Sequence, residues 1–312
     1  MTDTPRLLLL DTASLYFRAF FGVPDSLRAP DGTPVNAVRG LMDFISRLVR
    51  EYEPTHLACC WDNDWRPQWR VDLLPSYKAH RVVEVVDDGS DVEEVPDPLE
   101  LQIPVILDVL EAWGLPVVGA DGYEADDVIG TLATEAGMPV DVVTGDRDLF
   151  QLVDDDASVR VLYTARGVGR HERVDAAWVV AKYGVLPGQY ADFATLRGDS
   201  SDGLPGVPGV GDKTAASLLL RFGDLSGIRA AAEDPDAELS PSVRRKLKDA
   251  SAYLDVAPEV VAVARHIDLG APDLRLAGGV ADSARAAELT RRWDLGTSAE
   301  RLTAVVAGRA QD

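Results

Sequence analysis

Short apolar runs alternate with longer stretches of helical periodicity over the first two thirds of the chain. The runs are typical of strands buried on both faces, and the periodic stretches between them are typical of helices. The runs are residues 6–10, 57–61, 116–118, 140–144 and 159–162, and helical spacing occurs in residues 38–52, 103–113 and 128–136. This alternation predicts an α/β fold with a mostly parallel sheet flanked by helices.

The pattern changes near residue 190. Beyond it, turns rich in Gly, Pro and Asp separate short helical segments, which predicts an α/β domain over residues 1–189 and a helical subdomain over residues 190–312. Residues 86–100 contain seven acidic and no basic side chains and predict a mobile, solvated loop. Residues 197–212 form a long Gly/Pro/Asp cluster of the kind that more often has a function than not.

Composition narrows the class of protein. The chain has 312 residues with 52 acidic and 31 basic side chains, a net charge of −21 that disfavours non-specific polyanion binding without excluding local basic contacts. Its first apolar run is far shorter than the ~18–20 residues of a membrane span, so we expect a cytoplasmic protein. Two adjacent cysteines and four scattered histidines provide neither a disulfide framework nor a zinc site.

Acidic side chains follow three of the predicted strands, where the carboxyl ends of parallel strands form one edge. Two further groups belong near this edge, one opening the helix after residues 116–118 and one in the Gly/Pro/Asp cluster. The nine residues are Asp11, Asp62, Glu124, Asp126, Asp127, Asp146, Asp148, Asp199 and Asp202. So many carboxylates repel one another unless cations compensate them, and oxygen ligands favour Mg²⁺ or Mn²⁺. Two such ions suit hydrolysis of a phosphodiester, although any single member of the set could be an ordinary helix cap.

Residues 206–214 (GVPGVGDKT) resemble a phosphate-binding ATPase loop but fail its spacing, because Asp212 stands between Gly211 and Lys213. What remains is a Gly209-Val210-Gly211 turn that enters a helix near Lys213 and Thr214. Its backbone N–H groups suit a nucleic-acid phosphate, although a plain helix–helix turn is the alternative.

Two basic stretches are candidates for nucleic-acid contact. Residues 70–81 carry three cations and an aromatic side chain that could grip a single strand by charge and stacking: Arg70, Tyr77, Lys78 and Arg81. The second stretch contains Arg244, Arg245, Lys246 and Lys248, which a solvated helix face would explain equally well.

Six segments, in order, resemble the bacterial 5′ nucleases related to flap endonucleases, a family that also forms the N-terminal domain of bacterial DNA polymerase I. They are LLLLDTASLYFRAF (7–20), CWD (60–62), WRVDLLPSYKAHR (69–81), GYEADDVI (122–129), VVTGDRDLFQLV (142–153) and LRGDSSDGLPGVPGVGDKTA (196–215). The resemblance spans about residues 5–225. It implies a PIN-like catalytic domain with an arch at about residues 70–100, and a subdomain of helix-hairpin-helix type (helix-three-turn-helix).

The resemblance also implies roles for single residues. Asp11, Asp62, Glu124 and Asp126 match ligands of the ion that activates water, with Asp127 in the same motif, and Asp146, Asp148, Asp199 and Asp202 match ligands of a second ion. Lys78 and Arg81 match catalytic arch residues, with Arg70 at the arch base and Tyr77 beside it. The turn at 209–211 with Lys213 and Thr214 matches the element that binds duplex DNA, commonly with K⁺. Gly203 departs from the family pattern, where many relatives have Asn.

The function implied is a Mg²⁺- or Mn²⁺-dependent 5′-3′ exonuclease and flap endonuclease in primer removal and DNA repair. Its partners would be DNA with 5′ single-stranded flaps or ends, with RNA/DNA hybrids as further candidates, and a monomer that binds no membrane is expected. Because the sequence ends at Asp312 without polymerase sequence, a stand-alone nuclease is expected. Two alternatives stay open: a PIN-type ribonuclease, and a paralogue that binds DNA structures with little or no catalysis.

Overall fold

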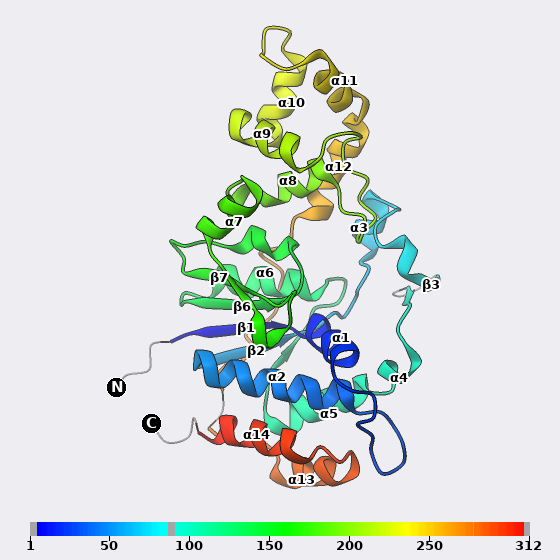
Figure 1. The fold of residues 1–312 in the computed structure, drawn as a ribbon, viewed down its shortest axis with the longest axis vertical. Coiled ribbons are helices and arrows are strands. Elements are labelled where there is room, and N and C mark those ends of the chain that lie inside the picture. The colour runs from blue at the N-terminus through cyan, green and yellow to red at the C-terminus, as the bar shows by residue number, and fades with distance from the viewer. Residues whose placement is uncertain (1–4, 87–90, 277, 309–312) are drawn as a thin grey trace.

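The computed structural model describes residues 5–86, 91–276 and 278–308 (Figure 1). The strands are β1 (Leu7–Asp11), β2 (His56–Cys60), β3 (Val82–Glu84), β4 (Val92–Glu93), β5 (Val117–Val118), β6 (Val140–Thr144), β7 (Val159–Tyr163) and β8 (Glu172–Val174). The α-helices are α1 (Thr12–Gly22), α2 (Asn36–Tyr52), α3 (Gln68–Leu73), α4 (Asp97–Glu100), α5 (Ile103–Trp113), α6 (Ala125–Glu135), α7 (Ala176–Tyr183), α8 (Tyr190–Arg197), α9 (Asp212–Phe222), α10 (Leu225–Glu233), α11 (Pro241–Asp249), α12 (Ser251–Val261), α13 (Ser283–Arg292) and α14 (Gly296–Ala307). Short 3₁₀ helices are η1 (Ala79–Arg81), η2 (Asp148–Leu152), η3 (Val168–Arg170) and η4 (Pro187–Gln189).

The central sheet has the strand order β5-β2-β1-β6-β7-β8, and every neighbouring pair is parallel except β7 and β8. The mostly parallel α/β sheet expected from the sequence is therefore confirmed. All five predicted strands are present, shifted by at most one residue at either end. The antiparallel edge strand β8 was not predicted, because its three residues include the polar Glu172 and Arg173 and form no apolar run.

Helices cover both faces of the sheet (Figure 1). Along β1, Leu7 and Leu9 join the core that contains α6, whereas Leu8 and Leu10 join the core that contains α2 and α5. Alternate side chains of one strand thus serve two cores, which explains why β1 is a continuous apolar run. Burial on both sides leaves the carboxyl ends of the strands as the edge that can meet a ligand.

The helical part lies above the side of the sheet that contains β6 and β7. Helices α9, α10, α11 and α12 form one end of the molecule (Figure 1). The apolar side chains of this part continue the core on the α6 face of the sheet, including Leu218, Leu219, Ile228 and Leu254. The turn between α8 and α9 therefore sits on a rigid base.

The helices at the end of the chain, α13 and α14, do not belong to the helical unit predicted to begin at residue 190. Helices α13 and α14 pack against α5 and α2, at the opposite end of the molecule from α9 and α11 (Figure 1). Their buried side chains Leu289 and Leu302 join the core of α2, and Trp113 Nε1 donates to Thr303 Oγ1 at 3.0 Å. Helical periodicity alone could not show which core these helices cover, so the single helical unit predicted over 190–312 is wrong for residues 283–307.

The segment that includes residues 70–100 leaves the sheet after β2 and returns at α5. It contains α3, η1, the antiparallel pair β3–β4, and α4. The described residues 91–100 of the loop predicted at 86–100 contain β4 and α4, Asp91 pairs with Arg66, and Leu99 is buried, although half of these residues are exposed as expected. Residues 87–90 lie outside the described residues. We call residues 61–102 the arch segment.

In the part of the chain that the structure describes, no helix combines the length and the apolar character that crossing a membrane requires.

Candidate active site

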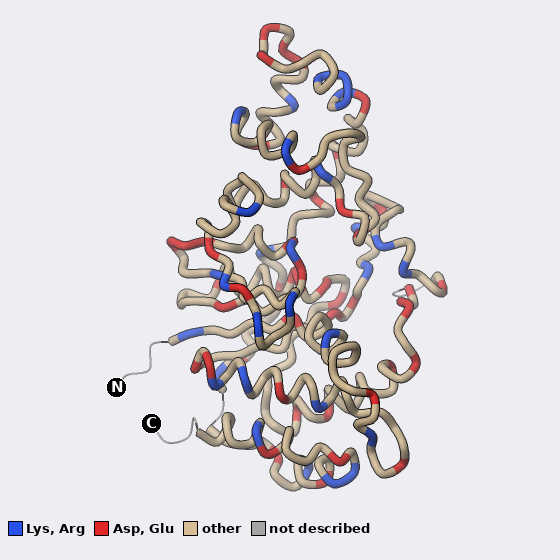
Figure 2. Tube along the Cα trace, in the orientation of Figure 1, with Lys and Arg blue, Asp and Glu red and all other residues tan. Residues whose placement is uncertain are grey.

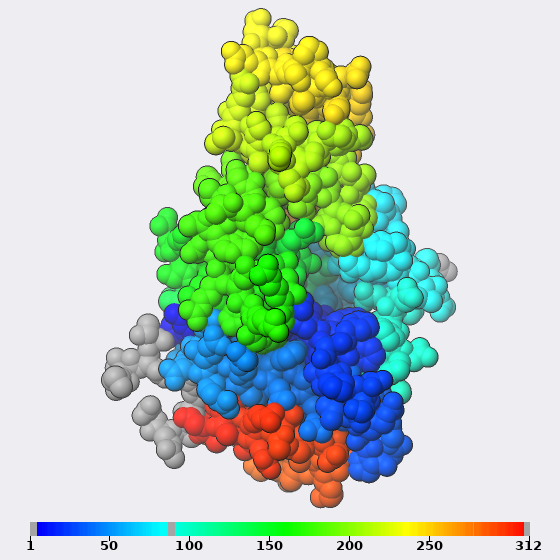
Figure 3. All heavy atoms as spheres, viewed as in Figure 1, coloured from blue at the N-terminus to red at the C-terminus, as the bar shows by residue number. Residues whose placement is uncertain are grey.

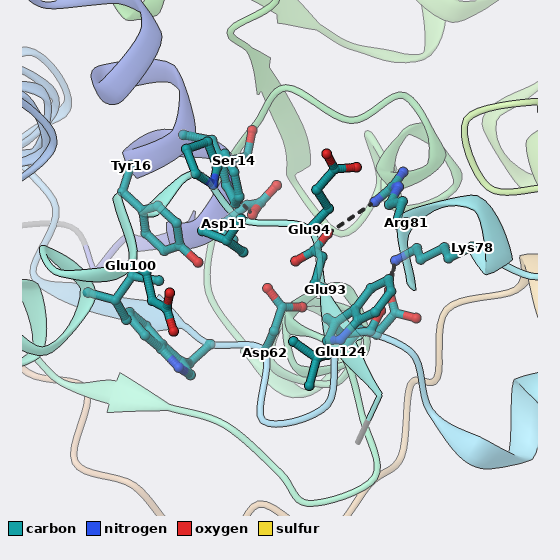
Figure 4. A pocket seen from close by; sticks show the side chains of 18 of the residues that line it. Asp11, Ser14, Tyr16, Asp62, Lys78, Arg81, Glu93, Glu94, Glu100 and Glu124 are labelled. Atoms are coloured by element: carbon teal, nitrogen blue, oxygen red, sulfur yellow. Dashed lines mark hydrogen bonds and ion pairs between the residues drawn. The ribbon is translucent and has the colours of Figure 1, made fainter. Parts of the chain in front are cut away.

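The carboxylates predicted at the strand ends meet at one cleft between α1 and the arch segment (Figures 3 and 4). The cleft has a volume of about 1230 Å³. A small enclosed cavity of about 50 Å³ adjoins it and shares Glu124, Asp126 and Asp146. The cleft adds Asp11 and Asp62 to this shared set, and the small cavity adds Asp148 and Asp202. Seven of the nine predicted carboxylates thus line two overlapping cavities, and Asp127 and Asp199 line neither.

Asp11 shows how β1 and its neighbours position a carboxylate. It caps α1 by accepting from Ser14 N at 3.0 Å and accepts from the Thr144 hydroxyl at the end of β6 at 2.6 Å. Burial, together with repulsion from Asp62, raises the pKa of Asp11 to about 7. The sheet therefore orients the Asp11 carboxylate, but the hydrogen bonds it accepts do not offset the cost of burying its negative charge.

Neighbouring carboxylates share this electrostatic stress. Burial first, then repulsion from Glu124, raises the pKa of Asp62, which accepts from Ala125 N at 2.8 Å. Burial and repulsion from Asp11 and Asp146 raise the pKa of Asp126 well above its usual value. Cations at this cleft would remove the penalty.

The second group carries an unsatisfied atom. Asp148 lies at the start of η2, and its buried Oδ1 has no hydrogen-bond partner. Burial and repulsion from Asp146 and Asp202 raise its pKa well above the usual value. A buried carboxylate oxygen without a donor is costly unless something outside the protein uses it.

Glu124 is held by the arch segment rather than left open. It caps α6, and its oxygens accept from Tyr77 Oη at 2.7 Å, from Arg70 Nη1 at 3.2 Å and from Lys78 Nζ. Burial alone would lower the pKa of Lys78, but the Glu124 carboxylate raises it well above its usual value. Lys78 is therefore a fixed cation beside the cleft.

Arg81 supplies a second cation from the arch segment. Its Nη2 donates to Ser201 O at 2.7 Å and to Asp202 Oδ1 at 3.1 Å, and it lines both cavities. Lys78 and Arg81 thus lie together at the cleft as expected, and Figure 4 shows both pointing toward its carboxylates.

Arg70 and Asp127 do not have the roles expected from the resemblance. Arg70 is buried, and its Nη1 and Nη2 donate to the two oxygens of Asp127 at 2.8 and 2.7 Å. Asp127 is fully buried and also accepts from Glu124 N and Ala264 N. These four donors occupy its lone pairs, so Asp127 is not available to a metal. Arg70 lines the small cavity but not the larger cleft, and Asp127 and Glu124 hold its guanidinium.

Asp199 and Tyr77 also differ from expectation. Asp199 accepts from Arg147, Arg197 and Ser201, and it lines neither cavity. Tyr77 is only 5% exposed and donates to Glu124, so its ring cannot stack on a nucleic-acid base. Both side chains orient neighbours of the cleft instead.

The turn at Gly209, Val210 and Gly211 lies away from the cleft, in the helical part. Gly209 has φ of +74°, Val210 N donates to Val207 O, and the Val210 side chain is buried in the core. Gly211 precedes α9, whose first turn presents the exposed Lys213 and half-buried Thr214. The expected turn into a helix is present, but neither the side chain nor the N–H group of Val210 is available to a ligand.

Several cleft residues were missed from the sequence. Aromatic side chains line the wall beside Asp11 and Asp62: Tyr16, Phe17, Trp61 and Trp65. The signal for the first two was their position in the first two turns of the helix that follows the strand-terminal Asp11. The acidic segment supplies another wall with Glu93, Glu94, Asp97 and Glu100, which sequence composition alone placed in solvent.

Described Asp, Glu, His and Cys side chains do not group in threes in a geometry ready to hold one ion. Donors of the protein hold several of the carboxylates instead. An α/β sheet that brings two sets of carboxylates and two cations to its carboxyl edge, beside an arch and below a helical subdomain, defines a nuclease that hydrolyses phosphodiesters.

Comparison with known proteins agrees. Residues 6–184 match the family model of the 5′-3′ exonuclease N-terminal resolvase-like domain, and residues 185–279 match that of the 5′-3′ exonuclease C-terminal SAM fold. The chain therefore belongs to the 5′-3′ exonuclease family.

Relatives named 5′-3′ exonuclease match almost the whole chain. The one from Streptomyces coelicolor is 61% identical over 295 residues, which are 95% of this chain and 98% of the relative. The one from Mycobacterium tuberculosis is 52% identical over 306 residues, which are 95% of this chain and 96% of the relative. A solved complex of the bacteriophage T5 flap endonuclease with DNA and metal ions has a TM-score of 0.64 at 16% identity, over 98% of this chain and 100% of that one, and shows the shared fold.

Proposed function

We propose that this chain is a divalent-metal-dependent 5′-3′ exonuclease and flap endonuclease that hydrolyses DNA during primer removal and repair. The observation that carries the proposal is the pair of overlapping carboxylate-lined cavities, in which burial and mutual repulsion raise the pKa of Asp11, Asp126 and Asp148. Such an arrangement is unfavourable in a protein unless cations join it.

The donor set fits Mg²⁺ or Mn²⁺. Both cavities present carboxylate oxygens, and the described residues that line them include no His or Cys, whereas hard divalent ions prefer oxygen ligands. Asp11, Asp62, Glu124 and Asp126 would hold one ion, and Asp146, Asp148 and Asp202 with the shared Asp126 would hold another. The unsatisfied Asp148 Oδ1 is a ready ligand atom. Asp127 and Asp199 would act by orienting their neighbours.

The ions would supply the activated water and neutralise charge on the reacting phosphate. The chain itself supplies two cations from the arch segment. Arg81 lines both cavities, so its guanidinium can meet a phosphate placed between them. Lys78 is paired with Glu124, and once Glu124 binds an ion, the Lys78 ammonium is free to turn toward the phosphate and stabilise charge that develops during cleavage.

The cleft suits a single strand that leaves a duplex. Its aromatic wall, which includes Tyr16 and Trp65, can pack against unpaired bases. An adjoining cavity of about 870 Å³ carries Arg18, Arg166 and Arg170, which form no ion pairs within the described part of the chain. These cations can hold backbone phosphates despite the net charge of the protein.

The duplex would be held by the turn at Gly209–Gly211 in the helical subdomain. The backbone N–H groups at the start of α9 and the exposed Lys213 face outward there, and such groups bind phosphates without reading bases. The solved T5 flap endonuclease of the same fold was crystallised with DNA and metal ions. RNA/DNA hybrids as further substrates, a monomeric state and a cytoplasmic location belong to the same proposal.

The test is cleavage of a duplex with a 5′-labelled flap, with Mg²⁺, with Mn²⁺ and with EDTA. We expect release of the flap near the junction with either ion and no product with EDTA. The variant Asp148→Asn keeps the side-chain volume and removes the charge, so it should bind the flap duplex and cut it poorly. Tight binding without cleavage in any metal would instead identify a DNA-structure-binding protein.

A further inference from the structure

Arg66 is a buried cation of the arch segment. It lies between residues 60–62 and residues 69–81, outside the segments that carry the family resemblance. Its side chain is 7% exposed and lines neither of the two carboxylate cavities. The guanidinium therefore meets atoms of the protein rather than a substrate in the cleft.

The guanidinium holds the turn that leads into Lys78. Its Nε donates to Tyr77 O at 2.6 Å, and its Nη2 donates to Pro75 O at 3.1 Å. The third nitrogen, Nη1, pairs with the carboxylate of Asp91. Because the five N–H groups of a guanidinium lie in one plane, these three partners fix the orientation of Arg66.

The backbone of Lys78 needs such support. Its φ is +47° and its ψ is 16°, a left-handed conformation that residues with a side chain rarely adopt and that persists only where neighbours hold it. Lys78 N donates to Asp202 O at 3.0 Å. The peptide group between Tyr77 and Lys78 is thus held at both ends, its C=O by Arg66 and its N–H by Asp202.

Gly203 makes room for the contact with Asp202. Its φ is +71°, and a Cβ at this position would lie 2.0 Å from Ser76 O and 3.4 Å from Lys78 N. The Ser76 hydroxyl also donates to Gly203 O at 2.8 Å. The absence of a side chain at Gly203 therefore lets residues 75–78 pack directly against residues 202–203.

Asp91 balances the charge of Arg66 and joins the two halves of the arch segment. Its side chain is 13% exposed, and its carbonyl accepts from Trp65 Nε1 at 2.7 Å. Trp65 O accepts in turn from Lys78 Nζ at 3.3 Å. Figure 2 shows basic positions before β3 and acidic positions after it, at the right of the molecule. A buried guanidinium that is paired in this way is not available to a phosphate.

This support matters most when the Lys78 ammonium leaves Glu124. Once Glu124 binds an ion, the ion pair that directs Lys78 Nζ is lost, and the backbone of Lys78 then decides where the ammonium can reach. We propose that Arg66 is the positioning residue of Lys78, which fixes the left-handed backbone there and so directs the ammonium at the scissile phosphate. The proposal rests on the proposed function, which gives Lys78 its role in cleavage.

The experiment measures cleavage of a 5′-labelled flap duplex in single turnover, with Mg²⁺ and saturating enzyme, and duplex affinity by anisotropy in EDTA. The proteins are wild type, Arg66→Met, Arg66→Lys, Lys78→Ala and the double variant Arg66→Met, Lys78→Ala. Gln68→Ala is the control, because it removes an exposed hydrogen bond to Asp72 within the same arch segment. Thermal unfolding checks that each variant folds. If Arg66→Met does not fold, Arg66→Lys with and without Lys78→Ala provides the same comparison.

We expect Arg66→Met to cleave about 10- to 100-fold more slowly at saturation, because a displaced ammonium is poorly aligned with the phosphate. Its duplex affinity, and the salt dependence of that affinity, should match wild type, since Arg66 makes no phosphate contact. The double variant should be no slower than Lys78→Ala, because Arg66 acts through Lys78. Arg66→Lys keeps a cation for Asp91 and a donor for one carbonyl, so it should recover part of the rate. Gln68→Ala should cleave like wild type.

Three results would overturn the proposal. Arg66→Met that cleaves at the wild-type rate would mean that the turn holds Lys78 without it. A double variant that is slower than Lys78→Ala by the full effect of Arg66→Met would mean that Arg66 supports the cleft in general and not Lys78. A weaker salt dependence for Arg66→Met would make Arg66 a phosphate contact.

Each of these results leaves flap cleavage by wild type intact, so the proposed function would stand. Wild type that cuts no flap with Mg²⁺ or Mn²⁺ would instead refute the proposed function, and the positioning role of Arg66 would fail together with it.

Discussion

Replacement of Arg70 by methionine tests whether this arginine acts through the protein rather than on the substrate. The change keeps most of the side-chain length and removes the guanidinium, which makes two hydrogen bonds to Asp127 and one each to Glu124, Val260 O and Ala262 O. The guanidinium is therefore the tie between the arch segment, α6 and the chain that leaves α12.

The cost can be worked out from burial. Arg70 is 3% exposed and Asp127 is 0% exposed, and loss of one partner of a buried ion pair typically costs about 3–5 kcal/mol. We expect about 3 kcal/mol, because Asp127 keeps the backbone donors Glu124 N and Ala264 N. This corresponds to a melting temperature lower by roughly 6–12 °C.

Urea unfolding in EDTA measures the free energy of unfolding, and a double-variant cycle with Asp127→Asn isolates the pair. The double variant Arg70→Met, Asp127→Asn should lose less free energy of unfolding than the two single variants together. Each single variant leaves one buried charge without its partner, whereas the double variant leaves none. The control is Arg301→Met, whose half-exposed pair with Asp43 should be worth less than about 1 kcal/mol. A loss below about 1 kcal/mol for Arg70→Met, or strict additivity in the cycle, would refute the reasoning.

Three further outcomes are expected. Asp148→Ala should lower flap cleavage by about 100-fold or more without weakening DNA binding, since it removes a ligand and a negative charge, and wild-type turnover would disprove the second ion site. Gly203→Ala should cost about 1–3 kcal/mol in urea unfolding, because its Cβ would lie 2.0 Å from Ser76 O at a φ of +71°, whereas Gly188→Ala has no atom within 4 Å and should be neutral. In EDTA, the pKa of Asp11 is about 7 in the folded protein against 3.8 for an ordinary aspartate, so the folded state holds a proton there that the unfolded state releases. The contribution of Asp11 to the free energy of unfolding therefore falls as pH rises from about 4 to 7. Asp11→Asn should flatten this profile, and an unchanged slope would contradict the assignment.

Local sequence pattern was enough for the sheet because each strand buries both faces. Five apolar runs mark five strands of the central sheet, and the carboxylates that follow β1, β2 and β6 reach one edge because parallel strands share a direction. By contrast, β8 is an edge strand of only three residues, two of them charged, which is too short to show a pattern of apolar positions.

Residue roles within a motif were harder to predict. Asp126 and Asp127 are adjacent in sequence on the first turn of α6, yet one lines the cleft and the other is buried against Arg70. Their side chains leave the helix about 100° apart, so a one-residue difference decides between a ligand and a structural anchor. Tyr77 illustrates the same point, since an aromatic beside two cations was equally compatible with base stacking and with a hydrogen bond to Glu124.

The sequence by itself determined the α/β class, the strands, the acidic edge and the turn before α9, since each depends on the order of residues along the chain. Only the tertiary structure decided that α13 and α14 cover the α2 face, that the acidic segment walls the cleft, and that residues 202–203 meet the turn at residues 75–78. These contacts join elements far apart in sequence, and similar amphipathic helices or charged residues could satisfy many partners. The choice among partners is made by packing, which buries one combination of faces and leaves the others in water.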